Sequence, residues 1–122
     1  MTYHFTQPSE ELSRRLLGTA PYKDRLPAGR LMPPVGIIPG HVRSLRELHL
    51  LLTPDARSLP GLSLTALANW VQRVIGDGEL AHALRNATEN AGSYVEGCLR
   101  VYELVGLRLE QARDVAGQEV LT

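Results

Sequence analysis

The sequence has almost no cysteine, no net charge and no long apolar segment, and each absence excludes a class of protein. A single cysteine, Cys98, in 122 residues excludes an internal disulfide and fits a reducing compartment. Thirteen basic and thirteen acidic residues cancel, which excludes a strongly basic nucleic-acid-binding protein. No apolar run approaches the roughly 20 residues that a membrane-spanning helix needs, and the first residues lack the pattern of a secretory signal. We therefore expect a cytoplasmic protein without a membrane segment.

Proline is absent from the second half of the chain, and this absence divides the sequence into two parts. All eight prolines lie within the first 60 residues, so the rest can form uninterrupted helices. The chain is long enough for one domain and too short for two separate cores. We predict a single all-α domain over residues 1–122, an irregular bundle of four or five helices. Residues 44–116 form its helical core, and residues 18–43 form a long extended arm rich in proline and glycine.

Residues that cap helices precede each segment with helical apolar spacing. Ser44 and Glu47 have the spacing of a capping box, in which the serine accepts a backbone hydrogen bond and the glutamate reaches back. Ser63 and Asp77 stand at the same position before later segments. The predicted helices span residues 9–17, 45–52, 64–75 and 77–116.

The segment 77–116 keeps its apolar spacing without interruption and is too long for the domain. One straight helix of this length would measure about 58 Å, whereas a compact domain of this size has a diameter of about 35 Å. The helix either protrudes or breaks. Gly92, followed by Ser93 as a cap and Glu96 three residues later, favours a break.

The last helix is apolar on most of its sides, because eight of the twelve residues from 98 to 109 are apolar. It is either the central helix of a monomeric bundle or a subunit interface. We predict self-association into a homodimer or larger assembly, because the apolar residues outside the core stripe would otherwise form an exposed patch. The predicted interface residues are Leu99, Tyr102, Leu104 and Leu107.

The arm predicted at residues 18–43 carries the second functional signal. A 26-residue connection with five prolines is unusual inside a compact domain and is often functional. The apolar run from 35 to 38 should pack against something, and residues 12–46 hold seven basic groups against one acidic group. The arm is therefore expected to contact another protein. As an alternative, it binds a small ligand or an anion through Arg25, Arg30, Arg43 and Arg46.

Candidates for catalysis and metal binding are weak. Glu79 and His82 have the spacing of one half of a di-iron motif, but the second half is missing. Cys98 lies on the core stripe, which predicts a buried and unreactive thiol. We predict no catalytic residue, no metal and no cofactor. The expected function is that of a non-enzymatic interaction module, and a helix-turn-helix regulator over residues 64–90 is a weaker alternative because its second helix lacks a basic face.

Overall fold

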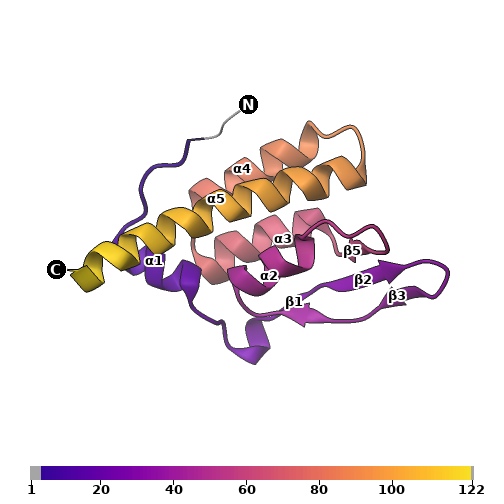
Figure 1. Cartoon of the computed structure of the whole chain (residues 1–122), viewed down its shortest axis with the longest axis horizontal. Helices are drawn as coiled ribbons and strands as arrows, with labels where there is room; N and C mark the ends of the chain where they lie inside the picture. Colours follow the sequence, from indigo (N-terminus) through magenta and orange to yellow (C-terminus); the bar gives the residue numbers. More distant parts are fainter. Residues whose placement is uncertain (1–3, 122) are drawn as a thin grey trace.

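The computed structural model describes residues 4–121, with the side chains of residues 4–117, and shows a mixed α/β domain (Figure 1). The prediction of an all-α bundle is wrong, because strands accompany the helices. The helices of this described part are α1 Glu10–Leu17, α2 Leu45–Leu52, α3 Leu64–Trp70, α4 Gly78–Glu89 and α5 Tyr94–Leu121, with a short 3₁₀ turn η1 at Tyr22–Asp24 and a π-helical turn η2 at Val71–Ile75. The strands are β1 Leu26–Pro27, β2 Gly29–Met32, β3 Gly36–Ile38, β4 His41–Val42 and β5 Leu59–Gly61.

The predicted arm is folded, and most of it forms one long β-hairpin. β1 pairs with β4 and β2 pairs with β3, both antiparallel and in the same register, so residues 26–42 make two continuous strands and a turn. β5 pairs with β2 on its other side, which gives the order β3-β2-β5. Gly29 allows the hairpin strands to approach, because a Cβ at this position would lie 2.2 Å from the Ile38 carbonyl oxygen. The expectation of an extended arm is therefore corrected to a hairpin.

The predicted capping residues begin the helices. Ser44 accepts a hydrogen bond from the Glu47 amide at 3.1 Å, and Asp77 accepts one from the Leu80 amide at 3.0 Å. Ser9 and Ser63 cap α1 and α3 in the same way. The predicted break is confirmed: α4 ends at Glu89, and Ser93 accepts a hydrogen bond from the third amide along at the start of α5.

α5 is a long helix that runs through the helical part of the domain (Figure 1). α1, α2 and α4 all pack against it. Its residues Val101, Val105, Leu109 and Ala112 are buried among side chains of these helices. The apolar character of this helix is thus accounted for largely within one chain, as the monomeric alternative requires.

A buried ion pair ties the N-terminal segment to the centre of the domain. Arg108 on α5 is only 2% exposed, and its Nε lies 2.7 Å from Oδ2 of Asp77. The same guanidinium donates through Nη1 to the Thr6 carbonyl oxygen at 2.6 Å and to Gln111 Oε1 at 3.0 Å. It also lies over the Phe5 ring, 5.1 Å from its centroid. Asp77 therefore has two roles, since it also caps α4.

Candidate functional site

The four residues predicted as a self-association interface lie on different sides of α5. Leu99 is 43% exposed. Leu104 is buried and lines a cleft against α4, while Leu107 is half-buried against the core. The Tyr102 ring stacks on the His49 ring of α2 with centroids 4.5 Å apart. These side chains do not form one patch, so a symmetric interface that uses all four would require α5 to leave its neighbours.

The four arginines predicted to bind an anion are not brought together. Three of them are held by contacts within the chain, and Arg46 is exposed on α2. These contacts are Arg25 over the Tyr22 ring at 4.1 Å, Arg30 Nη1 donating to Ser58 Oγ at 3.0 Å, and Arg43 Nε donating to the Ala20 carbonyl oxygen at 2.9 Å.

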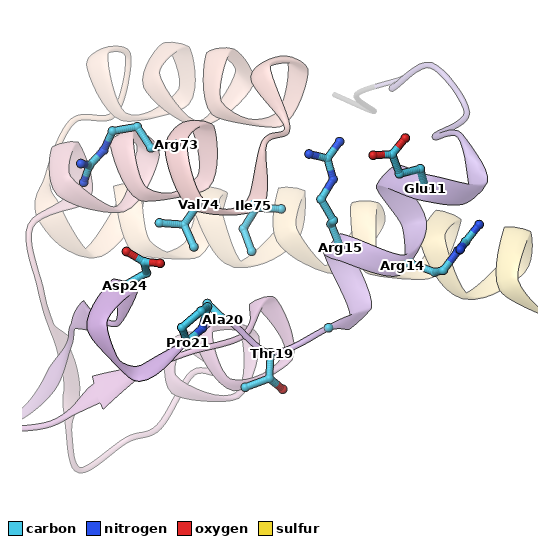
Figure 2. A pocket seen from close by; sticks show the side chains of 11 residues that line it. Glu11, Arg14, Arg15, Thr19, Ala20, Pro21, Asp24, Arg73, Val74 and Ile75 are labelled. Atoms are coloured by element: carbon cyan, nitrogen blue, oxygen red, sulfur yellow. The ribbon is translucent and has the colours of Figure 1, made fainter.

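A cleft of about 660 Å³ between α1 and η2 is lined by a different set of arginines (Figure 2). Arg14 and Arg73 stand at opposite ends of this cleft, and their guanidinium groups point away from each other (Figure 2). Arg15 lies between them, beside Glu11. Because the cations diverge and carboxylates accompany them, this cleft does not concentrate positive charge on one ligand position.

The most distinctive surface lies where the hairpin projects beyond the helices (Figure 1). Val35 is 78% exposed, Ile37 68% and Ile38 45%. Within the described chain only β2 pairs with this strand, so the packing partner expected for residues 35–38 is not supplied by the domain itself. On α2, Leu50 is 71% exposed. It faces the hairpin across a groove of about 380 Å³, whose apolar lining includes Met32 and Ile38.

The two edges of the three-stranded sheet differ in how they are covered. At the β5 edge, the Tyr94 hydroxyl of α5 donates to the Pro60 carbonyl oxygen and accepts from the Leu62 amide at 3.3 Å. At the other edge, no described segment pairs with β3. Of the two edges of this sheet, the β3 edge is therefore the one that offers unpaired backbone groups in the described part of the chain.

The register fixes which backbone groups face outward at this edge. Hydrogen-bonded and non-hydrogen-bonded pairs alternate along an antiparallel ladder. The Ala28 amide donates to the Gly40 carbonyl at 3.0 Å, which makes that pair hydrogen-bonded. In the continuous register, Ile38 then bonds to β2, and Ile37 does not. The N–H and C=O of Ile37 consequently point away from the sheet, into open space.

The side chain of Ile37 continues an apolar row across the sheet. Leu59 pairs with Leu31, and Leu31 pairs with Ile37, so the three residues are neighbours on one face. The row ends at the free edge, and residues 31–40 include no charged side chain. Native sheets usually protect such an edge with lysine or another charge. The sequence signal for this site is the apolar segment 35–38, which is expected to pack against something.

The remaining candidates for chemistry are the lone cysteine, a metal site and His82. Burial raises the pKa of the Cys98 thiol, in agreement with the predicted buried cysteine. Among the described residues, no group of three or more histidine, cysteine, aspartate or glutamate side chains could hold a metal ion. His82 is exposed on α4. None of the described helices is long and apolar enough to cross a membrane.

Comparisons with known proteins give no match, since no family model fits the chain and no curated protein or solved structure is significantly similar to it.

Proposed function

We propose that the protein is a non-enzymatic interaction module that binds an extended segment of a partner polypeptide along the free edge of β3. The observation that carries this proposal is the outward-facing N–H and C=O of Ile37, next to the exposed side chains of Val35 and Ile38. The partner contact expected of the arm is thus proposed for the hairpin that these residues form. An added strand would gain backbone hydrogen bonds from the edge and specificity from the pockets beside it.

The size of the apolar surface indicates what the partner must supply. Full burial of a large aliphatic side chain contributes about 1.5–3 kcal/mol. The exposed parts of Val35, Ile37 and Leu50 would together contribute roughly 3–6 kcal/mol, which a partner must set against an association cost of about 4–15 kcal/mol. The edge alone gives weak binding. A stable complex also needs apolar side chains in the groove between the hairpin and α2.

The alternatives find less support in the geometry. The residues proposed for an α5 interface do not share one exposed face, because Leu104 is buried and Tyr102 stacks on His49. The arginines proposed for an anion site do not form a cluster, because Arg25 contacts Tyr22 while Arg30 bonds to Ser58. The helix-turn-helix alternative needs a basic outer face on α4, and its exposed residues are mainly uncharged or acidic.

Site-specific photo-crosslinking tests the proposal. A photoreactive residue is placed at position 37 and, as a control on the exposed face of α5, at position 99 in cells that produce the protein. We expect a crosslinked polypeptide from position 37 and none from position 99. A synthetic peptide of the crosslinked segment should then protect the Ile37 amide from hydrogen exchange. Equal crosslinking from both positions, or a peptide that leaves this amide unprotected, would overturn the proposal.

A further inference from the structure

We propose that the strand that occupies the β3 edge is β3 of a second copy of this chain, so that two three-stranded sheets join into one continuous sheet. This inference rests on the proposed function and names the partner of that same edge. The edge is self-complementary: an antiparallel pair of identical strands has a two-fold axis, and one residue can pair with its own copy. The register makes Ile37 that residue, because its N–H and C=O both face outward.

The flanking prolines limit the pairing and keep it closed. Pro39 also has its backbone nitrogen on the outer side, where it has no N–H to donate, and Pro33 and Pro34 lie in the turn on the other side. The shared segment is therefore confined to the residues around Ile37. Because Tyr94 covers the β5 edge, each copy has one edge to offer. A pair uses up both free edges, and the sheet stops at two copies instead of growing into a fibre.

The side chains fit the same symmetry. A two-fold axis perpendicular to the sheet places Ile37 beside its copy on the same face. The row of Leu59, Leu31 and Ile37 would then continue into the equivalent row of the second chain. Ile38 points to the opposite face, where it lines the groove beside Leu50.

The charge distribution favours a second copy over a foreign partner. Residues 31–40 carry no charge, so two copies meet at this edge without repulsion between like charges. The groove beside this segment is lined by one arginine and one carboxylate, Arg30 and Glu47, so it does not repel its copy strongly either. A foreign partner selected by complementary charge would find nothing to recognise on this segment.

The oligomeric state and two matched variants test this inference. Sedimentation velocity from about 1 to about 200 µM should show a shift from 13.4 kDa towards twice that mass with concentration. Ile37→Lys places a charge on each side of the shared edge and should abolish the dimer. Leu99→Lys makes the same type of change on the exposed face of α5 and should leave the dissociation constant unchanged. Ile37→Pro deletes one outward donor from each copy and should weaken the dimer about 30-fold.

Circular dichroism identifies any variant that fails to fold. Hydrogen exchange of the unaltered chain gives a second test that needs no variant. The amide of Ile37 should become protected as concentration rises, while the amide of Val35 in the turn should change less. A monomer at all concentrations would overturn this inference but leave the proposed function standing if position 37 crosslinks to another polypeptide. A dimer that Leu99→Lys dissociates and Ile37→Lys does not would overturn this inference, and it would overturn the proposed function as well if position 99 crosslinks and position 37 does not. A dimer insensitive to both changes would overturn the inference alone.

Discussion

Replacing Arg108 by methionine tests the buried ion pair that joins α5, the start of α4 and the N-terminal segment. Methionine keeps most of the volume of the side chain and removes its charge and its donors. Asp77 would then keep a charge that is almost fully buried, without the Nε that lies 2.7 Å away. The Thr6 carbonyl would also lose its donor at 2.6 Å.

The expected loss is large relative to the stability of a domain this size. Removing one partner of a buried ion pair costs about 3–5 kcal/mol, because the remaining charge is left uncompensated. Single domains are stable by about 5–15 kcal/mol in total. Arg108→Met should therefore remove about a fifth or more of the free energy of unfolding. Adding Asp77→Asn removes the leftover charge and keeps an oxygen that can cap α4, so the double variant should be more stable than Arg108→Met alone.

Urea unfolding followed by circular dichroism gives these free energies by linear extrapolation. Arg100→Met serves as the control, because Arg100 forms an exposed pair with Glu96 and its loss should change stability little. A cost of Arg108→Met as small as that of the control would refute the reasoning. So would a double variant whose loss equals the sum of the two single losses, because the charges would then be independent.

Gly76→Ala should lower the free energy of unfolding by about 1–2 kcal/mol, because the backbone φ angle is +84° at this position. Gly78→Ala should not lower it, because a Cβ at that position would meet no atom within 4 Å. Equal losses from the two variants would contradict the strain argument. Burial, followed by the charge of Arg113, lowers the pKa of His49, so the folded state favours the neutral ring. The free energy of unfolding should therefore fall as pH drops through about 6.5, the ordinary histidine value, and level off below the lowered folded pKa. Urea titrations at about pH 7.5 and about pH 5.5 measure this fall, and His49→Gln should reduce it. The Cys98 thiol, whose pKa burial raises, should react with a disulfide reagent far more slowly in the folded protein than in urea; similar rates would show that it is accessible.

The helices could be predicted closely because their signals are local. Ser44 and Asp77 cap helices through hydrogen bonds to amides three residues away, so short sequence patterns record them directly. The break before Ser93 has the same origin. Only the C-terminal end was misplaced, since α5 continues to Leu121 beyond the predicted end at residue 116.

The strands could not be predicted because each is two to four residues long and depends on a distant partner. Gly29 and Pro39 oppose each other in the hairpin, and Pro60 lies inside β5. Glycine and proline usually mark loops, so the local pattern indicated an arm. Pairing across the hairpin and with β5 overrides that preference. Pro39 and Pro60 each lack an N–H, but their nitrogens lie on the outer side of the strand, so no hydrogen bond between the strands is lost.

The candidate site shows the same division between local and distant causes. The apolar segment around Ile37 is visible in the sequence, but its exposure depends on where the helices end in space. Arg108 could have been noticed from its position, because it follows Val105 by three residues and precedes Ala112 by four on the buried face. Its partner Asp77 stands 31 residues earlier, and only the packing of α4 on α5 brings the two together.

The central position of α5 also constrains when the protein can fold during synthesis. α1, α2 and α4 each bury a face against this helix, yet it is synthesised after all three of them. The contact of the N-terminal segment forms late, because the Thr6 carbonyl accepts its hydrogen bond from Arg108, which is made 102 positions later. The helical core can therefore close only once α5 has been made, and until then the apolar faces of the earlier helices lack their partner.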